Sequence, residues 1–225
     1  MGGRSRPGVT GAAGAVASAL LLVACGAGPA PSAENRKSCV SSPAGGTVES
    51  FQGPSYDYDP LRSPDELAKQ SELIVSGTIS AVREGRTTVF PTNKQIEGST
   101  TAVVVIANVT AVRGQPQAGN DGSVYLELHG LNHPDPARIS RALPGGARVV
   151  AYLVPAWDGT PRAGTDGALA NPAAGRPAGQ ALYLPAGPQG LAIQVAEGNV
   201  VWPLIGVQAP GCIADALPGG NLIGQ

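Results

Sequence analysis

Both histidines of this 225-residue chain fall within one seven-residue run, His-Gly-Leu-Asn-His-Pro-Asp. Neutral imidazoles and a carboxylate are accepted zinc ligands, so a loop could bring His129, His133 and Asp135 onto one ion. The four-residue spacing of the histidines places them on one face only in a helix, and Gly130 and Pro134 oppose a helix. The commoner interpretation is a strand end followed by a polar turn, and we expect no metal or other cofactor.

No other segment carries a recognised catalytic motif. The sequence contains no G-x-S-x-G, H-E-x-x-H or S-x-x-K pattern and no phosphate-binding glycine loop. The common hydrolase and nucleotide chemistries therefore lack their signatures, although a triad assembled from distant residues stays open. We expect a protein without catalytic activity.

The N-terminus has the anatomy of a secretory signal. Arg4 and Arg6 give it a positive start, residues 7–24 carry no charge, and small residues precede Cys25. The closing run Leu-Val-Ala-Cys resembles the lipobox of bacterial lipoproteins, in which the cysteine is diacylated and becomes the mature N-terminus. A retained, uncleaved signal anchor is the alternative.

The lipobox resemblance implies where in the cell the protein is located. Residues 1–24 would be removed, and the acyl chains on Cys25, of the palmitate type, would hold the protein on the outer face of the cell membrane. Two chains suffice for stable anchoring, whereas one binds only marginally. The composition, rich in Ala, Gly and Pro, also resembles that of actinobacterial lipoproteins.

The charge of the mature chain argues against nucleic acid as a partner. Removing residues 1–24 takes two of the 15 basic side chains and leaves 13 against 16 acidic ones, a net charge of −3. Only three lysines occur and the arginines are scattered, so there is no basic patch that could contact phosphates.

Cys39 and Cys212 remain once Cys25 is assigned to lipid. Export to an oxidising compartment predicts that these two form a disulfide. Such a long loop would contribute at most roughly 5 kcal/mol in the chain-entropy treatment. The alternatives are two free thiols or a metal site, and no C-x-x-C spacing supports the metal.

A tether and a short helix precede the folded domain. Residues 25–62 are rich in Pro, Ser, Gly and Ala without a sustained period, which predicts a linker from the membrane. Ser63 then suits a helix cap, Pro64 the first helical position, and Glu66 the return bond of a capping box. We expect this helix to end near Gln70 or Ser71.

A two-residue apolar period predicts strands in the rest of the domain, residues 63–225. The strands are expected at 72–82, 100–112, 123–129, 148–154, 190–196 and 199–204. Gly77 predicts a bulge in the first strand, residues 197–199 a hairpin turn, and Pro203 a strand end or edge.

The long segment 156–180 is dominated by Gly, Ala, Pro and polar residues and has no periodicity, which predicts a mobile surface insertion. Trp157 borders this insertion and is our candidate partner contact, because aromatic residues are enriched at binding hot spots. Trp202 lies in a predicted strand, where it is expected to fill the core.

Several long antiparallel strands with one short N-terminal helix predict a mainly β fold. A small closed barrel is favoured because closure removes exposed edges, and a β-sandwich is the alternative. The order of LIVSGTI (73–79), VTAVRG (109–114) and LPGGARVVAYL (143–153) resembles uncharacterised bacterial secreted domains related to netrin and tissue-inhibitor modules. That resemblance covers residues 63–205 and implies an OB-like barrel.

Two functions follow as expectations. The first is a non-catalytic extracytoplasmic lipoprotein whose barrel binds an envelope protein or glycan; the resemblance to inhibitors is weakened because they use a free N-terminal cysteine amine, which acylation of Cys25 would block. The second is a metal-dependent or hydrolytic envelope enzyme that uses the loop with His129, His133 and Asp135. The fold alone does not choose between them.

Overall fold

The structure, a computed structural model, describes most of the predicted domain but not the predicted signal segment. The described residues are 39, 58–91, 98–117, 121–129, 136–143, 145–160, 167–196 and 198–225. They all belong to one compact unit, Arg36–Gln225, whereas Cys25 and most of the predicted tether lie outside them. Among these residues no helix has the length and apolar character needed to cross a bilayer.

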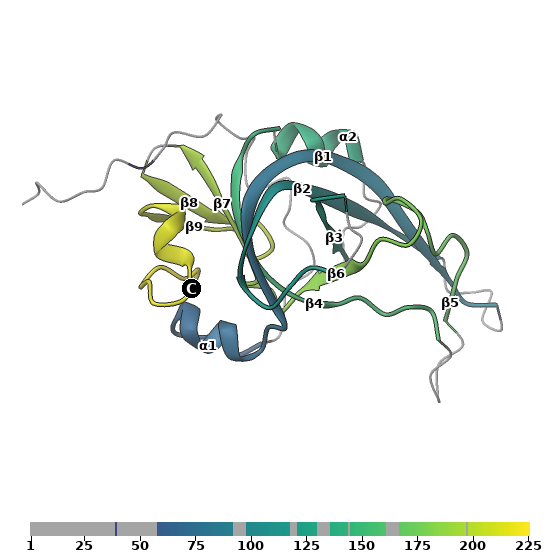
Figure 1. Cartoon of the computed structure of the whole chain (residues 1–225), viewed down its shortest axis with the longest axis horizontal. Coiled ribbons are helices and arrows are strands. Elements are labelled where there is room, and N and C mark those ends of the chain that lie inside the picture. Colours follow the sequence, from purple (N-terminus) through teal and green to yellow (C-terminus); the bar gives the residue numbers. More distant parts are fainter. Residues whose placement is uncertain are drawn as a thin grey trace, which may run out of the picture. The chain divides into compact units, whose positions relative to one another are not determined.

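Strands dominate the described residues, with a few short helices (Figure 1). The elements in chain order are α1 (Pro64–Lys69), β1 (Leu73–Val89), β2 (Ser99–Arg113), β3 (Val124–Leu128), α2 (Pro136–Ala142), β4 (Arg148–Pro155), β5 (Ala168–Leu169), β6 (Leu182–Pro185), β7 (Leu191–Ala196), β8 (Asn199–Trp202), β9 (Val207–Pro210) and the 3₁₀ helix η3 (Ile213–Ala216).

Five strands close into a ring in the order β1-β2-β3-β6-β4, with β4 pairing back onto β1. Figure 1 shows how the long, curved β1 bends around this ring. The predicted small, mainly β, OB-like barrel is therefore confirmed. One pair differs from the antiparallel expectation, because β3 and β6 run parallel. Parallel neighbours need a long connection, and α2, β4 and β5 lie between these two strands.

The barrel interior holds the inward side chains of its strands. In β2, Ala102, Val104 and Ile106 pack inside, whereas Val103 and Val105 pack outside against Tyr125 and Leu182. This explains the continuous apolar centre of the strand, since coverings hide its outer face as well. In β3, Val124, Leu126 and Leu128 face the interior and Tyr125 faces outward, as the alternation of a strand requires.

The predicted helix start is confirmed in α1. The Ser63 Oγ accepts the Glu66 backbone N–H at 3.2 Å, and Pro64 occupies the first turn. The Glu66 carboxylate reaches back to the N–H of Arg62 at 2.7 Å, one residue earlier than a capping box requires. The helix ends at Lys69, close to the predicted position.

The predicted irregularities of the strands are also confirmed. The β1–β2 register shifts at Gly77, between Ser76 and Thr78. A Cβ at this glycine would lie 2.6 Å from Cγ2 of Ile106 and 2.7 Å from a backbone oxygen, so the bulge brings the two strands close together. Strand β8 ends at Trp202, directly before Pro203.

The second half of the predicted insertion packs against the barrel. Strand β5 pairs with the end of β1, and the side-chain oxygen of Asn171 accepts the N–H of Thr87 at 2.5 Å. Gly175 has no room for a Cβ, which would lie 2.5 Å from the side chain of Val103. The composition of the segment did not predict this packing. The contacts that hold it are hydrogen bonds and a close glycine contact, and neither produces an apolar period in the sequence.

Cys39 and Cys212 form the predicted disulfide. Their Cα atoms lie 5.3 Å apart across 173 residues of sequence. Cys212 directly precedes η3, and its backbone N–H donates to the Asp215 carboxylate at 3.2 Å. The bond therefore joins Cys39, in the predicted tether, to the residue directly before η3.

Candidate functional site

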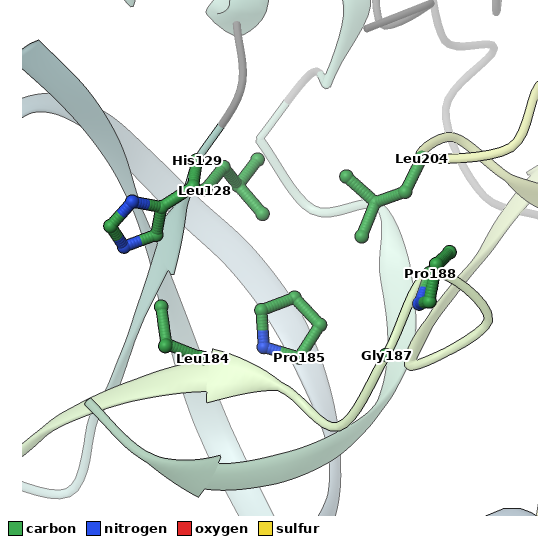
Figure 2. Close-up of a pocket in the computed structure, with 7 residues that line it drawn as sticks. All are labelled: Leu128, His129, Leu184, Pro185, Gly187, Pro188 and Leu204. Atoms are coloured by element: carbon green, nitrogen blue, oxygen red, sulfur yellow. The ribbon is translucent and has the colours of Figure 1, made fainter. Parts of the chain in front are cut away.

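A pocket of about 290 Å³ lies where β3 and β6 end (Figure 2). Its described walls come from the end of β3, the end of β6, the following turn and the segment after β8. These residues are Leu128, His129, Leu184, Pro185, Gly187, Pro188 and Leu204. The volume is at the lower limit of typical small-molecule pockets, about 300 Å³, and the walls are almost entirely apolar.

The turn that forms one wall is held rigidly. Gly187 has a φ of 111°, a conformation that only glycine adopts easily. On either side of it, Ala186 donates its N–H to the Tyr152 carbonyl at 2.8 Å, and Gly190 donates to the Gly187 carbonyl at 2.9 Å. The prolines on both sides of this turn further restrict it, so the wall is formed before any ligand arrives.

His129 is the one ionisable side chain among the described walls of the pocket. Its side chain is half exposed, and its Nε2 lies 2.9 Å from Oε2 of Glu127. Glu127 itself is completely buried on the outer face of β3. The histidine therefore joins the pocket to a buried charged cluster.

We call this set of side chains, Arg86, Thr101, Glu127 and His129, the Glu127 cluster. The Arg86 guanidinium donates to both carboxylate oxygens, through Nε at 2.9 Å and through Nη2, in the two-point geometry that makes such pairs strong. The Thr101 hydroxyl adds a third donor at 2.8 Å. Arg86 also donates through Nη1 to the backbone carbonyl of Trp157, so the cluster connects β1, β2 and β3 with the chain after β4.

Two opposing effects act on the pKa of Glu127. Burial raises it, whereas hydrogen bonds from Arg86, His129 and Thr101 and the charge of His129 lower it. The lowering effects are stronger, and the pKa falls to about 2. The carboxylate is therefore ionised, and the neighbouring Nε2 of His129 must be the donor in their contact.

A second arginine lies near the Glu127 cluster. Burial and then the charge of Arg86 lower the pKa of Arg176, while the charge of Glu127 raises it. Its Nε donates to the Gln180 carbonyl at 2.7 Å, and its buried Nη1 has no partner among the described residues. Residues 167–180 thus place a further positive charge over the outer face of the barrel.

The structure places the predicted site residues in different surroundings. His129 lines the pocket, but His133 and Asp135 lie outside the described residues, as does Cys25. The described residues contain no group of three potential metal ligands. Trp157 is half-buried and donates its indole N–H to the Thr160 carbonyl at 2.7 Å.

Trp202 is buried in an apolar cluster, as predicted for a core residue. Glu127 and Arg86 were missed as site residues. The period of β3 puts Tyr125, Glu127 and His129 on one face, yet nothing local showed that this face is covered. Arg86 lies beyond the predicted end of the first strand and 41 residues from its partner.

No family model, curated protein or solved structure matches this chain. The resemblance to netrin and tissue-inhibitor modules therefore stays a prediction. The class that fold and site define is an OB-like barrel with a rigid apolar pocket beside a buried ionic cluster.

Proposed function

We propose that this protein is a lipid-anchored extracytoplasmic binding protein without catalytic activity. Acylation at Cys25 holds it on the outer face of the cell membrane, and the pocket beside His129 receives an apolar side chain of an envelope protein. The observation that carries this proposal is a rigid apolar pocket in which the carboxylate bound to His129, that of Glu127, already accepts hydrogen bonds at both of its oxygens.

The state of Glu127 favours binding over acid–base chemistry. Each of its oxygens accepts two contacts, from Arg86 and Thr101 at Oε1 and from Arg86 and His129 at Oε2. A general acid or base works best with a pKa near the working pH, whereas the pKa of Glu127 is about 2. The carboxylate therefore serves to hold side chains in place.

The pocket itself favours an apolar group. Its leucines and prolines offer no donors for the hydroxyls of a sugar, and about 290 Å³ is room for one large side chain. Pockets of this kind accept the hot-spot residue of a protein partner. Trp157 lies next to the same cluster, because Arg86 binds its carbonyl, and it is a second contact candidate.

Cross-linking in intact cells tests this binding. Leu184→Trp fills the pocket from the half-buried end of β6 and should reduce recovery of the partner at least about tenfold, the loss expected when one hot-spot contact is removed. Val112→Trp adds the same side chain at an exposed position of β2 and should leave recovery unchanged. Equal recovery with both variants, at unchanged thermal stability, would refute the pocket as the binding site.

The anchoring part needs its own experiment. Cys25→Ala should release the protein from membranes and abolish incorporation of a palmitate analogue. A variant that stays in the membrane without taking up lipid would instead show an uncleaved signal anchor. Cys39→Ala is the matched control, because it changes a cysteine that is bonded to Cys212 and should not alter lipid labelling.

One observation favours the second candidate, a hydrolytic envelope enzyme. A carboxylate that accepts Nε2–H fixes the ring of His129 and leaves Nδ1 free to take a proton, which is the arrangement of many general bases. His133 and Asp135 follow His129 closely in the sequence and are the other predicted residues of this site. Under this hypothesis the unsubstituted protein hydrolyses members of a panel of ester and peptide substrates, and His129→Gln abolishes that hydrolysis. If the unsubstituted protein hydrolyses none of them, the hydrolase hypothesis is refuted and only the binding function remains.

A further inference from the structure

The pocket beside His129 exists because the ladder between β3 and β6 stops early. Only two residue pairs join these parallel strands, and the last is Leu126 with Tyr183. Strand β6 continues beside β4 as far as Pro185, which pairs with Leu153. A proline has no N–H to donate, so Pro185 cannot extend the ladder to β3, and the pocket lies between the two strand ends.

The walls of this space come from both strand ends, with the turn after β6 and Leu204 beside them (Figure 2). Leu128 and Leu204 belong to the core cluster of the barrel interior. His129 follows Leu128 and therefore lies on the opposite face of the strand, where it contacts Glu127. An occupant of the pocket thus meets core side chains at one end and the imidazole at the other.

The volume of the pocket favours a large occupant. An apolar protein cavity of roughly 150 Å³ holds one benzene ring, and this pocket measures about 290 Å³. A branched aliphatic side chain would leave much of that space empty and would lose dispersion contacts with the walls. The two fused rings of an indole fill the space better, so the volume favours tryptophan among the apolar side chains.

The imidazole of His129 also favours an aromatic occupant. Its Nε2–H donates to the ionised carboxylate of Glu127 at 2.9 Å, which fixes the orientation of the ring. The side chain is half exposed, so the ring is accessible to a partner. Two aromatic rings attract each other in offset or edge-to-face arrangements, and an aliphatic side chain gains nothing from this geometry.

The charges behind His129 act in the same direction. The guanidinium groups of Arg86 and Arg176 lie near one carboxylate, that of Glu127, so these three groups carry one excess positive charge. No acidic residue is among the described walls of the pocket. Because the face of an aromatic ring is the negative part of its quadrupole, this charge attracts a ring and disfavours an ammonium group.

We propose that the pocket beside His129 is specific for a tryptophan side chain of the protein partner. This inference rests on the proposed binding function and names the residue that the partner inserts. The indole fills the space between Leu128 and Pro185, and its outer edge lies against the ring of His129. Leucine, isoleucine and valine side chains bind less tightly because they are smaller and have no ring.

Saturation-transfer NMR on the full chain in detergent tests this specificity with three probes. They are N-acetyl-tryptophanamide, N-acetyl-phenylalaninamide and the saturated match of the second, N-acetyl-cyclohexylalaninamide. The tryptophan probe should bind saturably and most tightly. The cyclohexyl probe should bind at least about threefold more weakly than the phenyl probe, the ratio expected for one aromatic pair.

Two tryptophan variants supply the reference measurements for all three probes. Leu184→Trp fills the pocket, so its signal in the same detergent measures the background. Val112→Trp adds the same side chain at an exposed position of β2 and should bind the probes like the unsubstituted protein.

Two substitutions of His129 separate its ring from its hydrogen bond. His129→Gln keeps a donor for Glu127 but removes the ring, so the phenyl and cyclohexyl probes should then bind equally well. His129→Phe restores a ring and should restore the preference for the phenyl probe. Thermal unfolding of both variants separates a change in binding from a change in folding.

The outcomes distinguish this inference from the binding function on which it rests. Saturable binding of all three probes with equal affinity would overturn the tryptophan specificity and leave the apolar pocket as the binding site. A preference for the phenyl probe that survives in His129→Gln would overturn the role of the ring. Binding of no probe above the Leu184→Trp background would overturn the inference, and unchanged cross-linking of the partner by that variant would refute the binding function as well.

Discussion

The barrel is covered on its outside in two different ways. Over β2 and β3, residues 156–160 and 167–181 lie against the Glu127 cluster, in which a wholly buried carboxylate takes its partners from β1, β2 and the residue after β3. Over β1 and β4, helix α1, strand β8 and η3 form an apolar cluster around Trp202. In that second cover the Tyr152 hydroxyl makes a single hydrogen bond, to the Ala216 carbonyl at 2.7 Å.

We call the first the ionic cover and the second the apolar cover, and we expect substitutions to change the stability of the two in different ways. Apolar packing loses stability roughly in proportion to the atoms removed. In a buried ionic cluster, by contrast, removing one member leaves the others charged and unpaired, so the loss exceeds the value of any single contact. Because the ionic cover contains a titratable carboxylate, the stability that it contributes should depend on pH, whereas the contribution of the apolar cover should not.

The largest effect is expected in the apolar cover. Trp202 is 1 % exposed, and Trp202→Ala should lower the free energy of unfolding by about 4 kcal/mol, because it leaves a large cavity. Urea unfolding at several pH values measures this loss, which should be the same at each. A loss that varied with pH would show that the two covers are coupled.

Removing the carboxylate tests the ionic cover. Glu127→Gln should cost about 3 kcal/mol, because the buried Arg86 loses its counter-charge. The double variant Arg86→Met with Glu127→Leu should recover most of that loss, since neither member of the ion pair is then left buried without its counter-charge. Glu84→Gln, at an exposed position of β1, is the matched control and should change stability by less than about 0.5 kcal/mol. If the double variant were as unstable as the single one, packing and not charge would dominate this cover.

Acid should weaken the ionic cover selectively. The pKa of Glu127 is lowered in the folded protein from 4.5 to about 2, so the unfolded chain binds its proton first as the pH falls. The stabilisation is complete above about pH 4.5 and is lost as the pH falls toward 2, by up to about 3 kcal/mol. The difference between the unfolding free energies of the native protein and Glu127→Gln, measured from pH 2 to 6, should follow this curve. A flat difference would contradict the role of the carboxylate.

The smallest effect concerns the helix of the apolar cover. Ser63→Ala removes the acceptor for the Glu66 N–H and should cost about 1 kcal/mol. Hydrogen exchange should accelerate in α1 and leave β3 unchanged, because the cap belongs to only one cover. Equal acceleration in both would argue against separate covers.

Local features of the fold were predictable to a large extent. The period of two located β1, β2, β3, β4, β7 and β8, and the residues around Ser63 located α1, because these patterns report backbone conformation within a few residues. The short strands β5, β6 and β9 and the helices α2 and η3 were missed. Strand β6 contains four residues, too few to show a period. The candidate site was predictable only at His129, since its partners come from other strands.

The sequence by itself determined six of the strands (β1, β2, β3, β4, β7 and β8), the start of the first helix and the pairing of Cys39 with Cys212. The strands and the helix start depend on residues that are adjacent in the sequence, and the disulfide depends on the small number of cysteines available to pair. Only the tertiary structure decided that β3 pairs with β6 and that Glu127 meets Arg86. These contacts join segments far apart in the chain, and their polar side chains leave no periodic signal that would distinguish a buried partner from a solvated surface.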